Sequence, residues 1–223
     1  MSQKISTIAE RKIIEDFAKE ISLKKETGIH PEKTVIDFRN DRLKGKDGER
    51  YVYLVPTKLL RFRKDNGRIA SDVYSYEKQN GIREETIDTT QEIIRKFLTN
   101  KDEENNIKLR NLIKHSGQIE PAIITCDGFL INGNRRKMVI EDLYERTKEK
   151  KYETMKVVIL PGADDEGGPP TIKEIEQIEN RYQLQSDGKS EYTNFDRAIS
   201  MQRKIASGMS LEEQLKDDPS DSP

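Results

Sequence analysis

Apolar residues recur along this chain in two spacings, and together they predict a fold with both strands and helices. Continuous apolar runs, typical of buried β-strands, lie at 51–56, 122–125, 129–131 and 156–160. Apolar residues three and four positions apart, typical of helices that bury one face, lie at 7–25, 89–98, 106–116, after Gly133, and at 171–184 and 191–206. We therefore expect an α/β or α+β fold, with a small mixed sheet, surrounding helices and a helical C-terminal segment.

Three pairs of residues have the spacing of a capping box, in which two side chains bond to the first backbone N–H groups of a helix. The pairs are Thr7 with Glu10, Thr89 with Glu92, and Ser210 with Glu213. The helix over 7–25 has two interpretations: its apolar stripe packs on the chain's own sheet, or it binds a helix of a partner.

Polar segments predict the loops. Residues 39–50 are too polar to pack, 69–88 have no clear period and predict a loop or insertion, and 161–170 form an acidic loop rich in glycine and proline. Asp127-Gly128, between two short apolar runs, predicts a β-hairpin.

These elements predict the organisation of the chain. It comprises an N-terminal helix and polar extension (1–50), a core with an insertion at about 67–105 (51–165), a helical segment (166–216) and a disordered acidic tail (217–223).

Composition excludes several classes of protein. With 40 Lys and Arg against 41 Asp and Glu, the chain is not a globally basic nucleic-acid binder, although a local patch stays open. The single cysteine, Cys126, excludes an internal disulfide framework and a multi-cysteine zinc site, and two histidines exclude a histidine-rich metal site. No apolar run reaches the roughly 18 residues of a membrane span, and no signal peptide is evident. We expect a soluble, cytoplasmic protein without a membrane partner.

The first candidate site is Gly133-Asn134-Arg135-Arg136, where a strand turns into a helix. Glycine allows backbone to approach a ligand, and a helix N-terminus offers unpaired N–H groups to an anion. Arginines there oppose the helix dipole, but they suit phosphate. In the alternative, both arginines are solvated or pair with Glu141 and Asp142.

Four weaker candidates have structural alternatives. In 116–121, Gly117 and Pro121 are typical of a helix end and a strand start, so this segment predicts a connection between two elements rather than a site. Glu179-Asn180-Arg181 could bind Mg²⁺ and phosphate, against the alternative of a solvated helix face. Cys126 is a nucleophile only if a base lies near it, and otherwise a small hairpin residue. A DNA-facing stripe is diluted by acidic neighbours and is better interpreted as a solvated face; it comprises Lys108, Arg110 and Lys114.

In their order along the chain, these segments resemble the ParB-like N-terminal domain of the ParB/sulfiredoxin superfamily. The family pattern is helix, Gly-x-x-Gln/Glu-Pro, strand, Asp-Gly, strand, Gly-Glu-Arg-Arg, helix, a further strand, and then Glu-Asn on a helix. The matching residues are Gly117, Glu120, Pro121, Asp127, Gly128, Gly133, Arg135, Arg136, Glu179 and Asn180. Upstream, 52–60 and Asn66-Gly67-Arg68 resemble the family's opening strand and its Asn-x-Arg element.

The resemblance implies a switch domain that binds a nucleoside triphosphate, CTP or ATP, with Mg²⁺ and hydrolyses it slowly. It implies a homodimer that acts in a DNA-associated process, with DNA contacted through other domains or partner proteins. The implied metal ligands are Glu179 and Asn180, with Glu179 also catalytic. The implied nucleotide-binding residues are Gly117, Glu120, Pro121, Gly133, Asn134, Arg135, Arg136 and Arg181.

Two departures from the family pattern change what is expected. Asn134 stands where the family has an acidic residue, which removes a carboxylate, and where sulfiredoxins have their catalytic cysteine, which argues against that chemistry. The helix over 211–216 is followed by an acidic tail, where ParB proteins continue into a helix-turn-helix domain, so we do not expect this chain alone to read DNA sequence.

Two alternatives stay open. One is a ParB-like nuclease or a nucleotide-using phosphotransferase, whose carboxylates would come from Asp127, Glu141, Asp142 or Glu179. The other is an interaction module with a decayed site, which would bind partners through the 7–25 helix and the 67–105 insertion.

Overall fold

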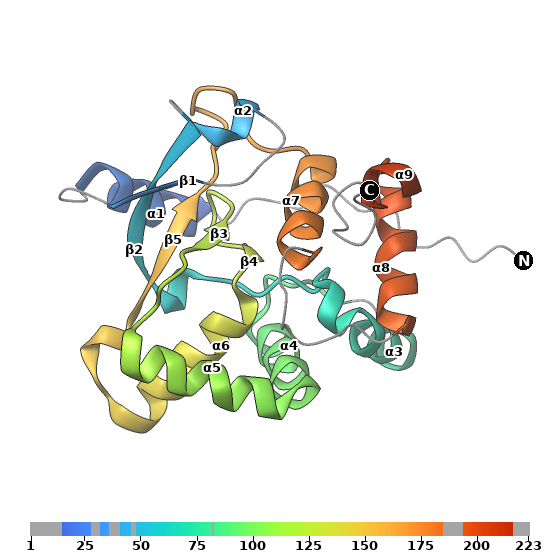
Figure 1. Cartoon of the computed structure of the whole chain (residues 1–223), viewed down its shortest axis with the longest axis horizontal. Helices are drawn as coiled ribbons and strands as arrows, with labels where there is room; N and C mark the ends of the chain where they lie inside the picture. Colours follow the sequence, from blue (N-terminus) through green and yellow to red (C-terminus); the bar gives the residue numbers. More distant parts are fainter. Residues whose placement is uncertain are drawn as a thin grey trace, which may run out of the picture.

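A five-stranded mixed sheet forms the centre of the fold (Figure 1). The computed structural model describes residues 15–27, 32–35, 41–45, 48–81, 83–184 and 194–215. The strand order is β1 (Lys33–Val35), β2 (Glu49–Pro56), β5 (Thr154–Ile159), β3 (Ala122–Ile124) and β4 (Leu130–Asn132). β5 pairs with β3 in parallel, and the other neighbours run antiparallel. The prediction of a small mixed sheet with surrounding helices is confirmed.

The helices surround this sheet on both faces. They are α1 (Glu15–Thr27), α2 (Asp41–Lys44), α3 (Ala70–Asn80), α4 (Asp88–Lys101), α5 (Glu103–Ser116), α6 (Asn134–Thr147), α7 (Ile172–Leu184), α8 (Asn194–Ala206) and α9 (Leu211–Leu215), with single 3₁₀ turns η2 (Thr57–Leu59), η3 (Gly67–Ile69) and η4 (Lys150–Tyr152). In Figure 1, α8 and α9 lie at the opposite side of the molecule from β1 and β2.

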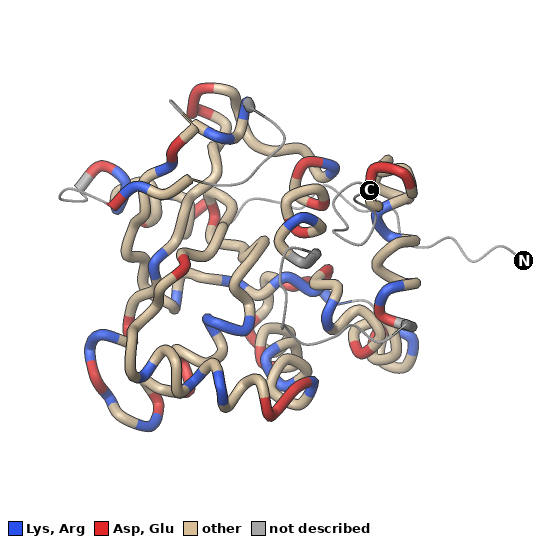
Figure 2. Tube along the Cα trace, in the orientation of Figure 1, with Lys and Arg blue, Asp and Glu red and all other residues tan. Residues whose placement is uncertain are grey.

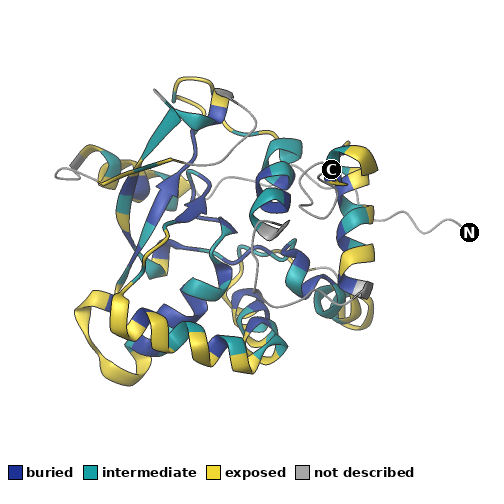
Figure 3. Cartoon of the chain, in the orientation of Figure 1, coloured by how far each residue is buried: buried dark blue, intermediate teal, exposed yellow. Residues whose placement is uncertain are grey.

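Two apolar cores lie on the two faces of the sheet. The larger core joins β2, β3, β4 and β5 to α1, α4, α5 and α6, and the smaller core joins the other face to α2 and α7. Figure 3 shows the central strands as the most buried part of the fold. Fully buried side chains of the larger core include Val55, Ile124, Val139 and Val157, and those of the smaller core include Leu43 and Val158. The sheet thus holds the N-terminus of α6 and the C-terminus of α5 in fixed positions.

The predicted hairpin between β3 and β4 is confirmed. The Thr125 hydroxyl donates to Asp127 Oδ1 at 2.6 Å, and the Gly128 N–H donates to the Thr125 carbonyl at 3.0 Å. Gly128 has a φ of +89°, and a Cβ there would lie 2.1 Å from the Leu59 carbonyl oxygen. Glycine is required at this turn by both its backbone conformation and its packing. Cys126 occupies the same turn, as expected for a small hairpin residue.

Of the two interpretations of 69–88, the loop is wrong, because 70–80 form helix α3, and the insertion stays a prediction. Asp196, from α8, accepts the backbone N–H of Ser71 at 3.0 Å, so a distant carboxylate caps the N-terminus of α3. The Tyr76 ring packs edge-on against Phe97 of α4, with ring centroids 6.0 Å apart. Long-range contacts stabilise this helix, and the local sequence pattern could not reveal them.

The prediction that 39–50 are too polar to pack is also wrong for part of that segment. Residues 41–44 form α2, and Leu43 is fully buried in the smaller core. Arg42 donates to the carbonyls of Gly167 and Gly168 and pairs with Glu174, so its charge is satisfied while Leu43 points inward. Strand β1, which pairs with β2, was not predicted from the sequence.

Helix boundaries follow the capping predictions only in part. The Ser210–Glu213 box is confirmed, because Glu213 N–H donates to Ser210 Oγ at 3.1 Å and Ser210 N–H donates to Glu213 Oε2 at 2.8 Å. The start at Thr89 is wrong: α4 begins at Asp88, and its N-cap makes no side-chain hydrogen bond. The Thr7–Glu10 pair and the tail at 217–223 lie outside the described residues.

Membrane-spanning segments were searched for in the same parts of the chain. None of the helices within the described ranges is at once long and apolar enough to cross a bilayer.

Candidate functional site

A cavity of about 440 Å³ lies between the N-terminus of α6, helix α5, η3, the segment 117–120 and α7. Its apolar wall is made by Leu109, Leu112, Ile113 and Ile119. Its polar wall includes Arg68, Lys108, Arg135 and Arg136, against two carboxylates, Glu120 and Glu179. The volume lies within the range of small-molecule sites, and the combination of an apolar wall with convergent cations is typical of such sites.

The N-terminus of α6 opens into this cavity. Its first residues, Asn134, Arg135 and Arg136, have backbone N–H groups without acceptors within the helix. Gly133, the N-cap, has no side chain to cap them, and the first turn contains no acidic residue. The dipole and the two arginines therefore add positive potential at the same place. The strand-to-helix turn predicted from the sequence at Gly133–Arg136 is therefore present.

Gly133 lines the cavity and also packs closely against the core. Its φ is +95°, and a Cβ there would lie 2.6 Å from the Cβ of Ala122 and 3.3 Å from the terminal methyl of Met155. The close approach of α6 to β3 thus accounts for the glycine at this position.

Arg135 is held by groups at the start of α5. Its Nε donates to Asn106 Oδ1 at 3.0 Å, and its Nη1 lies 3.9 Å from Asp102 Oδ2. The side chain is only 14% exposed. Burial, together with the positive charge of Arg68, lowers the pKa of Arg135.

Arg136 is held by the segment that precedes β3. Its Nη1 donates to the carbonyls of Glu120 and Pro121 at 2.8 and 2.9 Å, and its Nη2 lies 3.1 Å from Glu120 Oε2. The alternative in which the two arginines pair with Glu141 and Asp142 is wrong. Those carboxylates instead pair with Lys137, Arg95, Arg110 and Arg146.

Asn134 brings an unpartnered acceptor to the same turn. The residue is 6% exposed, its Nδ2 donates to the Leu130 carbonyl at 3.4 Å, and its Oδ1 has no hydrogen-bond partner in the described ranges. A buried acceptor without a donor is energetically unfavourable.

The segment 117–121 forms one wall of the cavity. Gly117 ends α5 with a φ of +70°, and its N–H donates to the Ile113 carbonyl, as its predicted role at a helix end requires. Gln118 pairs with the backbone of β5: its Nε2 donates to the Lys156 carbonyl at 2.8 Å, and Lys156 N–H donates to its Oε1 at 2.7 Å. Gly117 and Glu120 line the cavity, while Pro121 lies just outside its lining.

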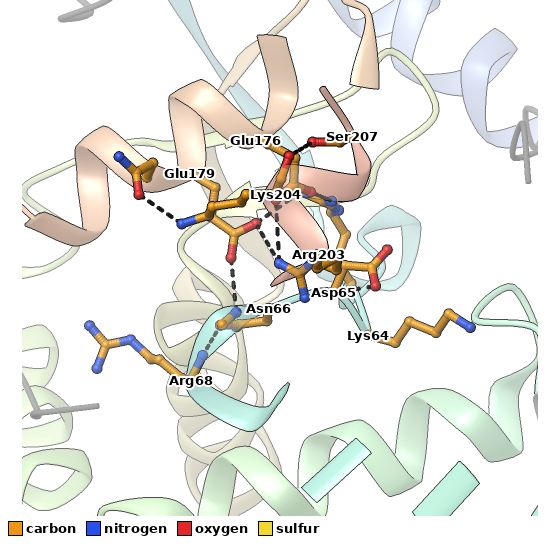
Figure 4. A network of polar contacts seen from close by, with 12 residues as sticks. Lys64, Asp65, Asn66, Arg68, Glu176, Glu179, Arg203, Lys204 and Ser207 are labelled. Atoms are coloured by element: carbon orange, nitrogen blue, oxygen red, sulfur yellow. Dashed lines mark hydrogen bonds and ion pairs between the residues drawn. The ribbon is translucent and has the colours of Figure 1, made fainter. Parts of the chain in front are cut away.

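Glu179 reaches the cavity from a buried ionic cluster (Figure 4). Its Oε1 accepts the Gly67 N–H at 3.0 Å, and its Oε2 lies 3.3 Å from Arg63 Nη1 and 3.7 Å from Arg203 Nη2. Glu176 joins the same two arginines, at 3.0 and 3.4 Å. The pKa of Glu179 is raised by burial and by the charge of Glu176, although Arg63 and Arg203 act in the opposite direction.

Asn180 and Arg181 do not line the cavity. The Asn180 Oδ1 accepts from Lys204 Nζ at 2.8 Å, and its Nδ2 donates to the Gln214 carbonyl at 3.0 Å, so this side chain binds α8 and α9. Glu179 is 3% exposed and Asn180 5%, so the alternative of a solvated helix face is wrong for both.

The side chains predicted to hold Mg²⁺ do not form a joint set of open oxygen ligands. Both carboxylate oxygens of Glu179 and the amide oxygen of Asn180 already accept hydrogen bonds or lie within an ion pair. Within the described ranges, no three His, Cys, Asp or Glu side chains are grouped as metal ligands. In this arrangement the side chains are thus engaged with the protein itself and do not form a preformed metal site.

Sequence reasoning noted Asn66-Gly67-Arg68 only as a matching element and missed it as part of the site. Asn66 and Arg68 both line the cavity, as do Asn105, Lys108 and Tyr182. The Asn-x-Arg pattern was the available signal for Arg68. Its position beside Arg135 depends on a contact between η3 and α7, and that contact has no sequence signature.

Outside the cavity, the described helices carry charged residues of both signs (Figure 2). Figure 2 shows basic and acidic residues interspersed over the helices. In the stripe on α5, Lys108 is 66% exposed and pairs with Glu104 at 2.6 Å, as expected for a solvated face. Arg110 is only 25% exposed and pairs with Asp142 of α6 at 2.6 Å, so the solvated-face interpretation is wrong for this residue.

Comparison with protein-family models, with curated proteins and with solved structures finds no match to this chain. The relation to ParB-like domains therefore rests on the motifs alone and stays a prediction.

Proposed function

We propose that the cavity between α5 and α6 binds the phosphate groups of a nucleoside triphosphate, CTP or ATP, and that the protein is a nucleotide-binding switch domain. The observation that carries the proposal is the N-terminus of α6, whose unpaired N–H groups open beside Arg135 and Arg68. The DNA-associated process and the homodimer come from the resemblance to ParB-like domains.

The lining of the cavity offers suitable groups for both the phosphates and the base of a nucleotide. Phosphate oxygens would accept from the first N–H groups of α6 and from arginine, whose fork of donors suits two oxygens of one phosphate. The opposite wall, with Leu112 and Ile119, offers apolar surface to a base. An anion at the N-terminus of α6 would also remove the conflict between its dipole and its arginines.

Binding without rapid hydrolysis is the better supported mode. Asn134 brings no carboxylate to the first turn of α6, and Glu179 and Glu176 are both held by Arg63 and Arg203. Asp127, a carboxylate of the nuclease alternative, accepts from Thr125 in the hairpin and is 1% exposed. The nuclease alternative thus gains no support from the geometry.

Replacement of Arg135 by alanine is expected to weaken nucleotide binding about 10- to 100-fold, because a hydrogen bond to a charged group contributes about 1.5–3 kcal/mol. The measurement is isothermal titration with CTP, ATP, GTP and UTP. The double variant Arg135→Ala/Arg136→Ala should show no saturable binding. Arg146→Ala, in α6 but 62% exposed, is the matched control and should bind as the wild type does. Wild-type affinity in the double variant would refute the pocket assignment.

Removal of Mg²⁺ is expected to change nucleotide affinity by no more than about threefold, which is under 1 kcal/mol. The positive charge of the cavity comes from arginines, and the oxygens of Glu179 and Asn180 are already engaged. The test is the same titration in EDTA. A loss of more than about tenfold in EDTA, reproduced by Glu179→Gln in the presence of Mg²⁺, would establish the metal site instead.

A further inference from the structure

Arg68 has a fixed backbone at the edge of the cavity. Its N–H donates to Asn66 Oδ1 at 3.0 Å, and the N–H of the preceding Gly67 donates to Glu179 Oε1 at 3.0 Å. Ile69, which follows, is fully buried. Figure 4 shows the Arg68 side chain directed away from the cluster of Glu176, Glu179 and Arg203. The segment thus presents Arg68 to the cavity from rigid neighbours.

Arg68 and Arg135 reach the same cavity from elements far apart in the sequence. Burial lowers the pKa of Arg135, and the positive charge of Arg68 acts in the same direction. Reduced solvation strengthens the repulsion between like charges, so an anion that contacts both arginines would lower the electrostatic energy of this site.

Arg136 has different surroundings. Its three nearest acceptors, the carbonyls of Glu120 and Pro121 and the Glu120 carboxylate, all belong to the wall segment 117–121. Both N–H groups on its Nη1 are therefore engaged by this wall. Gln118 ties the same wall to β5, so Arg136 and Gln118 fix it from two sides.

We propose that Arg68 and Arg135 together bind the phosphate groups of the ligand, and that Arg136 is a positioning residue that holds the wall segment 117–121. This inference rests on the proposed function and assigns the three arginines that line the cavity to two roles. It places Arg68, rather than Arg136, beside the phosphates.

The two roles predict different dependence on ligand charge. A cation that contacts phosphate contributes more to a triphosphate than to a monophosphate, because the Coulomb energy grows with the charge of the ligand. A residue that only shapes the wall affects both ligands by the same factor. The ratio of triphosphate to monophosphate affinity therefore separates the roles.

The experiment is calorimetric titration of the whole chain with the triphosphate and the monophosphate of the nucleotide that binds best. Arg68→Ala is expected to weaken the triphosphate about 10- to 100-fold and to lower the affinity ratio at least about fivefold. Arg68→Lys, which keeps the charge, should retain most of the ratio. Arg136→Ala should weaken both ligands by one factor and leave the ratio unchanged, and the control Arg146→Ala should change neither.

Each outcome supports or refutes the roles assigned to Arg68 and Arg136. An unchanged ratio in Arg68→Ala refutes its role at the phosphates, and a drop in Arg136→Ala as large as that in Arg68→Ala refutes the positioning role. Because backbone bonds fix η3, both Arg68 variants should melt near the wild-type temperature, and unfolding of both would overturn the assignment. Absence of nucleotide binding by the wild type would refute the proposed function, and this inference with it.

Discussion

Replacement of Glu176 by alanine is expected to destabilise the fold by about 3–5 kcal/mol, because it removes the nearest carboxylate from two buried arginines. Glu176 is 1% exposed and joins Arg63, at 3.0 Å, to Arg203, at 3.4 Å. Burial alone would lower the pKa of Arg63, but the carboxylates of Glu179 and Glu176 raise it. Glu179 would remain as a more distant partner of both arginines, at 3.3 and 3.7 Å.

Urea unfolding of the wild type and of Glu176→Ala measures this loss. Glu104→Ala is the matched control: its side chain is 80% exposed and pairs with Lys108 on the same helix, so its loss should stay below about 0.5 kcal/mol. A loss in Glu176→Ala no larger than that of the control would contradict the cluster as described. Because Glu176 lies on α7 and Arg203 on α8, the same variant should also loosen α8.

Gly133→Ala is expected to destabilise the fold by about 2–5 kcal/mol. A non-glycine residue at a positive φ costs about 1–2 kcal/mol, and overpacking of a core adds about 1–3 kcal/mol. The new Cβ would lie 2.6 Å from the Cβ of Ala122, on a buried strand that has no room to move.

Gly208→Ala is the matched control for the backbone contribution. Its φ is +89°, close to the +95° of Gly133, but no heavy atom lies within 4 Å of the position that a Cβ would take. Its expected loss is therefore about 1–2 kcal/mol. Equal losses in the two variants, measured by urea unfolding, would mean that the contact of α6 with β3 is not tight.

The parts of the fold that the sequence predicts correctly are those that local residues determine. The turn at Asp127-Gly128, the end of α5 at Gly117 and the capping box of Ser210 and Glu213 each depend on residues within a few positions. Helix α3 depends instead on Asp196 of α8. The burial of Leu43 depends on the bonds of Arg42 to Gly167 and Glu174, which are distant in the sequence. No periodicity could reveal either contact.

In the candidate site, too, local features could be predicted from the sequence and tertiary contacts could not. The turn at Gly133 and its two arginines could be predicted because strand, glycine and helix are contiguous. The roles of those arginines could not, because Arg136 is held by the carbonyls of Glu120 and Pro121 and Arg135 by Asn106 of another helix. Asn180, expected beside Glu179 as a metal ligand, instead binds Lys204. These partners follow from tertiary packing alone.

The measurement that tests the central claim most directly is a titration of the ¹⁵N-labelled protein with CTP and ATP, followed by NMR. If the N-terminus of α6 binds phosphate, the largest saturable shifts will be those of the backbone amides of Asn134, Arg135 and Arg136, with smaller shifts at Gly117 and Arg68. Saturable shifts that leave these amides unmoved, or no shifts with either nucleotide, would contradict the claim.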